Sequence, residues 1–311
     1  MRTVFLGTPE FAVPTLAALV NAGHDVIAVY TQPDRPKGRG KQLTESPVKI
    51  AAKKLGIEVY QPERIRRPES VEQLRDFAPE VMVVVGYGQI LPQSIIDIPR
   101  HGILNVHASL LPKYRGAAPI QWAIANGETR TGVTIMQIDA GMDTGDMLLK
   151  SELEIGPDET APELSARLAP LGADLLVEAI RRIELGSSLR EKQNNDQATY
   201  APILKKEDGK VDWSRTAQQI YNRLRGFTPW PGAYTMFRGQ PLLINWGKPA
   251  QDMHVPQGML YVQNRRLSVG CGENTVFELL EVQPPAKKKI AADAFLNGYK
   301  VANGELLGAE L

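Results

Sequence analysis

The chain has 311 residues, 43% of them hydrophobic, and its 36 basic and 35 acidic residues leave a formal net charge of +1. This length predicts about two domains, each with an ordinary hydrophobic core. With a net charge near zero, the protein as a whole has no positive electrostatic field that would attract a polyanion. Any nucleic-acid contact would therefore have to come from local basic clusters. The single cysteine, Cys271, excludes an internal disulfide and a cysteine-rich metal site, and it favours a reducing compartment.

The N-terminal residues do not resemble a targeting signal. The opening M-R-T-V-F-L-G-T-P-E-F has too short an apolar run and becomes acidic too soon for a signal peptide. The longest apolar run, near residue 81, is much shorter than a membrane span and is typical of a buried strand. We therefore expect a soluble cytoplasmic protein with no membrane contact.

Short apolar runs alternate with helical patterns through the first half of the chain. Apolar and β-branched runs predict strands at residues 3–6, 25–31, 58–60, 81–85, 103–107, 132–138 and 147–153. Helical patterns lie at residues 11–22, 47–55, 69–77, 118–125 and 160–183. This alternation predicts an α/β fold, with an open, mostly parallel sheet and helices on both faces.

The pattern changes after a polar stretch at residues 186–200, which has almost no apolar periodicity and is typical of an interdomain linker. Beyond it, one helical pattern at residues 215–224 precedes short strands at 234–237, 242–246, 259–263, 267–269 and 276–282. These strands predict a small, OB-like β-barrel. We therefore predict a first domain at residues 1–186, a linker at 187–204 and a barrel domain at 205–311.

Several common kinds of site are poorly supported. A dinucleotide site would need G-x-G-x-x-G after the first strand, but only Gly7 is present and Pro9 removes a backbone donor. No G-x-S-x-G nucleophile motif occurs. Four histidines without close H-x-x-x-H spacing do not suggest a metal site. We therefore expect neither NAD nor a metal.

Asn105 and His107 stand at the end of the strand predicted at residues 103–107. Side chains two residues apart leave the same face of an extended strand. Ligands bind at the carboxyl ends of strands in open α/β sheets, where an amide can stabilise an oxyanion and a histidine can move a proton. The alternative is structural: the asparagine caps the turn and the histidine bonds to nearby backbone.

A glycine-rich acidic loop, D-A-G-M-D-T-G-D at residues 139–146, follows the next long strand. One of its carboxylates, Asp139, Asp143 or Asp146, could reach His107, orient the ring and favour its charged form. The alternative is a surface turn in which Asp and Gly only satisfy the backbone geometry. The nearby Asn/His strand end makes the functional interpretation the stronger one.

Two basic clusters and one aromatic group are further candidates. R-P-K-G-R-G-K at residues 35–41 predicts a flexible basic loop that could contact phosphates, and Lys287–Lys288–Lys289 lies late in the predicted barrel. Each cluster could instead be solvated surface, and the lysine trio could be a solvated helix start. The aromatic residues could stack on bases, but we interpret them as barrel core; they are Phe227, Trp230, Tyr234 and Trp246.

Long stretches of the chain resemble a known family. Residues 105–122, N-V-H-A-S-L-L-P-K-Y-R-G-A-A-P-I-Q-W, and residues 132–147, G-V-T-I-M-Q-I-D-A-G-M-D-T-G-D-M, are similar to the signature of 10-formyltetrahydrofolate-dependent formyltransferases. T-Q-P-D-R-P-K-G-R-G-K, V-M-V-V-V-G-Y-G-Q-I-L-P and the late G-F-T-P-W-P-G resemble, in particular, family members that act on methionyl-tRNA. Together these stretches cover most of the chain.

The resemblance implies a Rossmann-like catalytic domain and a C-terminal barrel that helps to hold tRNA. It implies formyl transfer from 10-formyltetrahydrofolate to the α-amine of methionyl-initiator tRNA. The implied catalytic residues are Asn105, His107 and Asp143. The implied folate contacts are Tyr87, Ile90, Leu91, Ser109, Leu110, Leu111, Pro112 and Asp139. The tRNA contacts that we predict are Arg35, Lys37, Arg39 and Lys41 from the family's inserted loop, with Arg39 foremost, and Lys287, Lys288 and Lys289 from the barrel.

Two alternatives share some of these features. A sister formyltransferase could act on the amine of a sugar nucleotide or ribonucleotide with the same catalytic residues, although the two basic clusters favour tRNA. A non-catalytic RNA-binding protein could use the barrel alone, although the Asn/His/Asp set speaks against it. We expect a monomer.

Overall fold

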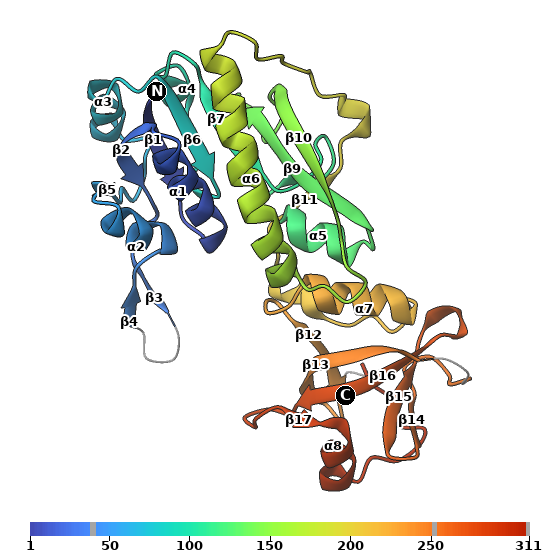
Figure 1. Cartoon of the computed structure of the whole chain (residues 1–311). Helices are drawn as coiled ribbons and strands as arrows, with labels where there is room; N and C mark the ends of the chain where they lie inside the picture. Colours follow the sequence, from blue (N-terminus) through green and yellow to red (C-terminus); the bar gives the residue numbers. More distant parts are fainter. Residues whose placement is uncertain (38–41, 251–253, 309–311) are drawn as a thin grey trace. The chain divides into compact units, whose positions relative to one another are not determined.

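The computed structural model describes residues 1–37, 42–250 and 254–308. The chain divides into two compact units, each with a sheet of its own (Figure 1). Unit 1 comprises Met1–Pro119, Arg130–Glu154 and Leu164–Pro202, and unit 2 comprises Ile120–Thr129, Ile155–Glu163 and the chain from Ile203 onward. This division differs in detail from the predicted boundaries: residues 187–202 belong to unit 1, and two short segments of the first half belong to unit 2.

In the described part of unit 1, seven strands form one sheet in the order β10-β9-β7-β6-β1-β2-β5. Strands β7, β6, β1, β2 and β5 are parallel, whereas β9 is antiparallel to both of its neighbours. The predicted open, mostly parallel sheet is therefore confirmed. The strands are β1 (Arg2–Gly7), β2 (Asp25–Tyr30), β5 (Val59–Tyr60), β6 (Val81–Val85), β7 (Ile103–His107), β9 (Arg130–Gln137) and β10 (Met147–Glu154).

Helices cover both faces of this sheet. Leu74 of α3 and Ile95 of α4 pack in one apolar cluster with Ile103 of β7. Val106, whose side chain leaves the opposite face of β7, lies against Gly172 of α6. The helices that lie wholly or mostly in unit 1 are η1 (Glu10–Ala12), α1 (Val13–Asn21), α2 (Pro47–Lys54), α3 (Pro68–Asp76), α4 (Gln93–Ile96), α6 (Ala161–Glu184) and η2 (Asn195–Gln197).

The strand order creates a ligand-binding edge. From β1 the chain proceeds to β2 and β5 on one side and then returns to β6 and β7 on the other side. The switch point therefore lies between β1 and β6, and open α/β sheets bind ligands at the carboxyl ends of the strands beside such a point. The strand β7, which ends in Asn105 and His107, is the next strand after β6.

Two short paired elements in unit 1 were not predicted. Strands β3 (Arg35–Lys37) and β4 (Gln42–Thr44) form an antiparallel pair at the base of the predicted basic loop. Strands β8 (Arg115–Gly116) and β11 (Tyr200–Ala201) form a parallel pair that joins the segment after β7 to the predicted linker. Each strand is too short to show a period of two in the sequence.

Unit 2 contains the predicted OB-like barrel. Its antiparallel strands follow the order β12-β13-β16-β15-β14, with β17 beside β16. The two edges meet because Leu307 bridges to Phe237 of β12, and the adjacent Leu306 bridges to Met259, next to β14. The strands are β12 (Ala233–Phe237), β13 (Gln240–Ala250), β14 (Leu260–Gln263), β15 (Arg266–Gly270), β16 (Val276–Gln283) and β17 (Ile290–Ala291).

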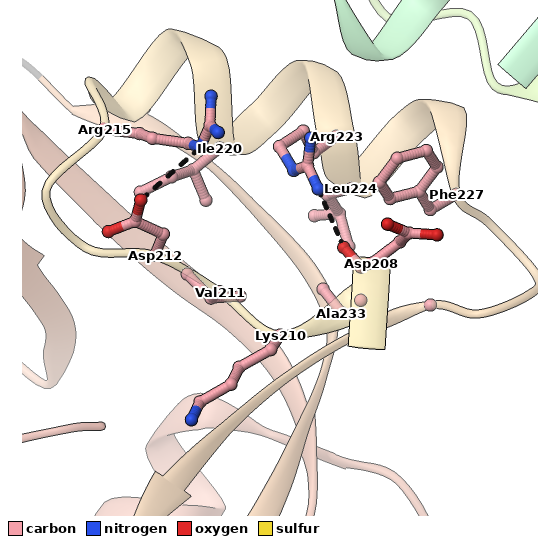
Figure 2. Close-up of a pocket in the computed structure, with 12 residues that line it drawn as sticks. Asp208, Lys210, Val211, Asp212, Arg215, Ile220, Arg223, Leu224, Phe227 and Ala233 are labelled. Atoms are coloured by element: carbon pink, nitrogen blue, oxygen red, sulfur yellow. Dashed lines mark hydrogen bonds and ion pairs between the residues drawn. The ribbon is translucent and has the colours of Figure 1, made fainter. Parts of the chain in front are cut away.

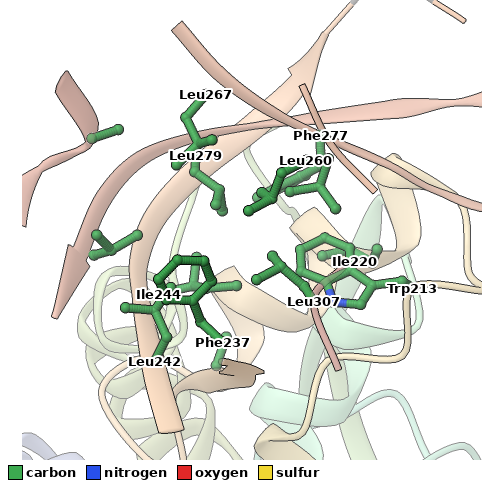
Figure 3. Close-up of a cluster of buried hydrophobic side chains, with 14 of the residues drawn as sticks. Trp213, Ile220, Phe237, Leu242, Ile244, Leu260, Leu267, Phe277, Leu279 and Leu307 are labelled. Atoms are coloured by element: carbon green, nitrogen blue, oxygen red, sulfur yellow. The ribbon is translucent and has the colours of Figure 1, made fainter. Parts of the chain in front are cut away.

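Side chains from the inner faces of these strands fill the barrel, together with Trp213 and Ile220 (Figure 3). The indole Nε1 of Trp213 donates to the Thr235 hydroxyl at 3.0 Å, so its buried polar atom is satisfied. The remaining helices are α5 (Pro119–Ala125), η3 (Lys206–Gly209), α7 (Ala217–Gly226), η4 (Gly272–Asn274) and α8 (Ala292–Tyr299). Helix α8 was not predicted. None of the helices in the described residues is long and apolar enough to span a lipid bilayer.

Candidate active site

Asn105, His107 and Asp143 converge at the carboxyl end of β7. The Nδ2 atom of Asn105 donates to Oδ1 of Asp143 at 3.3 Å, and Nδ1 of His107 lies 3.6 Å from Oδ2 of the same carboxylate. The His107 side chain is only 6% exposed and that of Asp143 is 17% exposed. The structure therefore brings together the three residues that the sequence singled out, at the edge where ligands bind in such sheets.

The ring of His107 is held in one orientation. Its Nε2 atom lies 2.9 Å from the backbone oxygen of Tyr114. A carbonyl oxygen can only accept, so Nε2 carries the proton of this hydrogen bond. In the neutral ring, Nδ1 is then the basic nitrogen, and it is the one that faces Asp143.

Asp143 is held from several directions. Its Oδ2 accepts a hydrogen bond from the backbone N–H of Gly116 at 2.8 Å. Its backbone has a φ of 53°, in the left-handed region that few non-glycine residues adopt. The side-chain amide of Gln193 donates to its backbone oxygen at 2.8 Å. Asp143 is thus the carboxylate of the acidic loop that faces His107.

Asp139 has a different environment in the same loop. Its Oδ1 accepts from the backbone N–H of Gly141 at 3.0 Å and from the Thr144 hydroxyl at 2.7 Å. These hydrogen bonds stabilise the backbone of the turn, which is the structural role considered above for the Asp and Gly residues of this loop. Asp139 remains a predicted folate contact.

Two of the predicted folate contacts after β7, Ser109 and Leu111, have side chains that are buried against other parts of the protein. The Ser109 side chain is fully buried, and its hydroxyl donates to the Lys113 backbone oxygen at 2.6 Å. Leu111 packs in a small buried cluster with Met136 and Met147. In this conformation, Ser109 and Leu111 expose almost no surface to a ligand. Leu110 and Pro112 are half-buried.

The predicted folate contacts after β6 differ in exposure. The Tyr87 side chain is buried, and its hydroxyl has no hydrogen-bond partner in the described residues. Burial raises the pKa of the Tyr87 hydroxyl well above its usual range. Leu91 packs partly buried against the core, whereas Ile90 is 89% exposed. Ile90 is therefore available for apolar contact with a ligand.

An open groove of about 770 Å³ lies at the carboxyl ends of β1, β2 and β6. Its volume is in the range of small-molecule sites. Arg35, on β3, is exposed at its rim. The residues that line the groove are Thr8, Pro9, Glu10, Gln32, Pro33, Arg35, Pro36, Thr44, Glu45, Ser46, Pro47, Gly86, Tyr87 and Gly88.

The predicted tRNA contacts occupy two places in the chain. Arg35 and Lys37 lie on β3, whereas Arg39 and Lys41 lie outside the described residues. Lys287, Lys288 and Lys289 are exposed between β16 and β17. Lys289 pairs with Glu281 at 3.1 Å. All of these contacts stay predictions.

The aromatic group is only partly core. Phe227 is buried and meets Trp122 edge-on, with ring centroids 5.2 Å apart. Trp246 is partly buried and lies edge-on to Tyr221. Trp230, in contrast, is 55% exposed, so the core interpretation is wrong for this residue. Trp230 lies in the turn T-P-W-P-G, between α7 and β12.

A second hollow lies beside α7 (Figure 2). Arg223 spans one side and donates through Nη2 to the backbone oxygen of Asp208 at 3.0 Å, while Arg215 pairs with Asp212 at 3.7 Å. The hollow encloses only about 10 Å³, which is room for about one water molecule. It is therefore too small for a folate or a nucleotide.

The prediction from sequence missed three residues that support the site: Gly116, Arg115 and Gln193. Arg115 and Gly116 form β8, in the segment after β7. A single sequence does not reveal that the Gly116 N–H bonds to Asp143 or that the Arg115 side chain bonds to Gln193. Gln193 lies in the polar stretch predicted as a linker. Apolar periodicity gives no sign of Gln193, because its contacts are hydrogen bonds to two backbone oxygens and to the Arg115 side chain.

Comparison with known proteins decides the family. The profile of the family described as formyl transferase matches residues 1–180, and that of the formyl transferase C-terminal domain matches residues 203–300. The chain belongs to the formyl transferase family. It is 60% identical to the methionyl-tRNA formyltransferase of Solibacter usitatus and 56% identical to that of Koribacter versatilis, over 99% of each chain. The chain is therefore a formyl-transferring enzyme.

Solved structures share its fold at much lower identity. An N-formyltransferase from Helicobacter canadensis, in complex with folinic acid and dTDP-3-aminofucose, is 19% identical with a TM-score of 0.67. The superposition covers 91% of this chain and 99% of that one. HypX from Aquifex aeolicus, in complex with tetrahydrofolic acid, is 16% identical with a TM-score of 0.64, over 98% of this chain and 48% of that one. These likenesses concern the fold.

Proposed function

We propose that the protein transfers the formyl group of 10-formyltetrahydrofolate to the α-amino group of methionyl-initiator tRNA, which yields N-formylmethionyl-tRNA for translation initiation. The observation that carries this proposal is the 60% identity to a methionyl-tRNA formyltransferase over 99% of both chains. The convergence of Asn105, His107 and Asp143 at the end of β7 supplies groups suited to acyl transfer.

In the first step, the neutral methionyl amine attacks the formyl carbon. A carbon–nitrogen bond forms, and the carbonyl electron pair moves to oxygen as a tetrahedral oxyanion. Asn105 uses one amide N–H toward Asp143 at 3.3 Å, and an amide carries two, so the second can donate to the oxyanion. A protonated His107 can donate from Nδ1, since Nε2 is engaged by the Tyr114 carbonyl.

In the second step, the oxyanion collapses and the bond between the formyl carbon and N10 of the folate breaks. The attacking amine loses one proton and N10 gains one, so the proton balance closes without a further reactant. His107 and Asp143, with Nδ1 and Oδ2 separated by 3.6 Å, can pass this proton along. Much of the rate would come from holding two large substrates in one geometry.

The groove and the strand ends suggest how the substrates are held. We assign the folate to the surface around Tyr87, Ile90 and Leu91, the segment at residues 109–112 and the 139–144 loop. We assign the tRNA to the basic residues at 35–41 and 287–289. The exposed guanidinium of Arg35 at the rim of the groove supports a phosphate contact beside the site.

One assay tests the function. The purified protein is mixed with 10-formyltetrahydrofolate and either initiator or elongator methionyl-tRNA, and formylmethionine is measured after deacylation. We expect efficient transfer to the initiator species.

Parallel reactions contain an amino-sugar nucleotide or a ribonucleotide amine. Transfer to one of these amines, with none to either tRNA, would overturn the proposal in favour of a sister formyltransferase. Tight tRNA binding without formyl transfer would indicate an RNA-binding protein instead.

We also propose that the enzyme acts as a monomer in the cytoplasm. The buried single cysteine, Cys271, is compatible with a reducing compartment. Sedimentation equilibrium at working concentration tests the monomer, since a mass of twice 34.3 kDa would contradict it.

A further inference from the structure

Residues 191–201, here called the strap, lie between the segments matched by the two family profiles, which end at residue 180 and begin again at residue 203. The sequence suggested a linker, but within unit 1 the strap pairs at both ends. Its first residue, Glu191, exchanges two backbone hydrogen bonds with Met147, at 2.8 and 2.9 Å. Its last residues form β11, which pairs with β8.

Between these ends, Gln193 places its side-chain amide against the acidic loop. Its Nε2 donates to the backbone oxygens of Asp143 and Gly145, both at 2.8 Å. Its Oε1 accepts from Nε of Arg115 at 2.9 Å. One amide thus joins two backbone oxygens of the loop that carries Asp143 to the Arg115 side chain.

The chemistry of the neighbours fixes the orientation of this amide. Arg115 is buried and can only donate, so the side-chain oxygen of Gln193 must face it. The two backbone oxygens can only accept, so the side-chain nitrogen must face them. Arg115 also donates through Nη2 to Asn195 of the strap at 2.9 Å. A carboxylate at position 193 could satisfy Arg115 but would oppose both backbone oxygens.

The strap also supports the residues around His107. The Thr199 hydroxyl accepts from the backbone N–H of Tyr114 at 2.9 Å, and the backbone oxygen of Tyr114 receives the His107 ring proton. The backbone N–H of Gly116, which holds the Asp143 carboxylate, lies on β8 beside the strap. The groups that orient both His107 and Asp143 are therefore attached to this one segment.

We propose that Gln193 is a positioning residue for formyl transfer: its side-chain amide holds the main chain of Asp143 and Gly145, so that the Asp143 carboxylate faces Asn105 and His107. This inference rests on the proposed function. The left-handed backbone of Asp143, with a φ of 53°, is a conformation that surrounding contacts have to maintain. Gln193 supplies two of those contacts without touching the reacting atoms.

The test compares Gln193→Glu and Gln193→Met with the same changes at Gln197. Gln197 is an exposed glutamine of the same strap, and no side-chain hydrogen bond joins it to other described residues.

We expect both Gln193 variants to lower kcat about 10- to 100-fold, because small displacements of catalytic groups have effects of this size. The KM for each substrate should stay within about twofold, and the Gln197 variants should match wild type. Gln193→Met introduces no charge, so it remains informative if Gln193→Glu is not recovered folded.

A double-mutant cycle separates positioning from general stability. If Gln193 acts through Asp143, then Gln193→Met should lower the single-turnover rate of an Asp143→Asn enzyme by less than about twofold, because the group it positions is already lost. An equal loss in both backgrounds, or a wild-type kcat in folded Gln193 variants, would overturn the inference. Absence of formyl transfer by the wild-type protein would instead refute the proposed function.

Discussion

The Nδ1 atom of His107 lies 3.6 Å from Oδ2 of Asp143, while Nε2 of the same ring donates to the Tyr114 backbone oxygen at 2.9 Å. The separation from Asp143 is longer than a hydrogen bond between these atom types. Catalytic hydrogen bonds are often long without substrate and tighten in the reacting complex. One ring nitrogen thus anchors the imidazole, and the other faces Asp143, where the proposed mechanism uses it.

The first prediction concerns the carboxylate. Asp143→Asn should lower kcat about 100-fold or more while both KM values change little, because proton transfer by a positioned group contributes about 10²–10⁴. The variant should stay folded, since asparagine tolerates the left-handed backbone at this position. Steady-state kinetics with both substrates measures the change. Asp146→Asn, in the same loop, is the matched control, and equal losses in the two variants would contradict the assignment.

The second prediction concerns the imidazole. His107→Ala should also lower kcat about 100-fold or more, because in the proposed mechanism His107 donates to the oxyanion and carries the proton. It should also lower the free energy of unfolding by about 1–3 kcal/mol, since the buried Tyr114 carbonyl loses its donor. Kinetics and urea unfolding measure the two effects. His101→Ala is the control, and near wild-type kcat in His107→Ala would exclude the assigned role.

The third prediction concerns the glycine that holds Asp143. Gly116 has a φ of 123°, and a Cβ atom there would lie 2.6 Å from the Ala201 backbone oxygen. Gly116→Ala should therefore destabilise the fold by about 1–3 kcal/mol and displace the N–H that bonds to Asp143, which lowers kcat.

The control is Gly23→Ala, where φ is 81° and no atom lies within 4 Å of the added Cβ. It carries backbone strain without a clash, so it should lose some stability in urea unfolding but keep kcat. If Gly116→Ala also loses only stability and keeps kcat, then the close approach of residue 116 to the Ala201 backbone is unimportant for the site.

The fourth prediction concerns the basic residues beside the groove. Arg35→Ala should raise the KM for tRNA and reduce the slope of log KM against log salt concentration by about one, because one phosphate contact is lost. The KM for 10-formyltetrahydrofolate should not change. Arg66→Ala, an exposed arginine outside the groove, is the control. A salt slope that equals the wild-type slope would show that Arg35 contacts no phosphate.

The fifth prediction concerns Cys271, whose burial raises the pKa of the thiol to about 12. The unfolded thiol ionises near pH 9 and the folded one much later, so the stabilising contribution is complete below pH 9 and is lost above it. The free energy of unfolding should fall by roughly 1 kcal/mol more between pH 8 and pH 10 in wild type than in Cys271→Ala. Urea unfolding at both pH values measures this difference, and parallel pH dependences would contradict it.

The local sequence determined much of the architecture and one part of the site. Apolar runs alternating with helical periodicity predicted the strand–helix order of unit 1, because burial on a sheet requires that pattern. The period of two along a strand placed Asn105 and His107 on one face of β7. These predictions succeeded because they depend only on neighbours in the chain. Short elements such as β3, β8 and β11 escaped, since two or three residues carry no period.

Only the tertiary structure decided how the polar groups are used. The local residue pattern allowed any carboxylate of the 139–146 loop to serve His107, and only the family resemblance implied Asp143. In the structure, the Gly116 N–H and the Gln193 amide hold Asp143 in that place. The Tyr114 carbonyl binds Nε2 of His107, so Nδ1 is the ring nitrogen that faces Asp143. The strap takes part through hydrogen bonds of its side chains to backbone oxygens and to Arg115. Hydrogen bonds of this kind join segments far apart in the chain and depend on direction and burial, so residue order carries no trace of them.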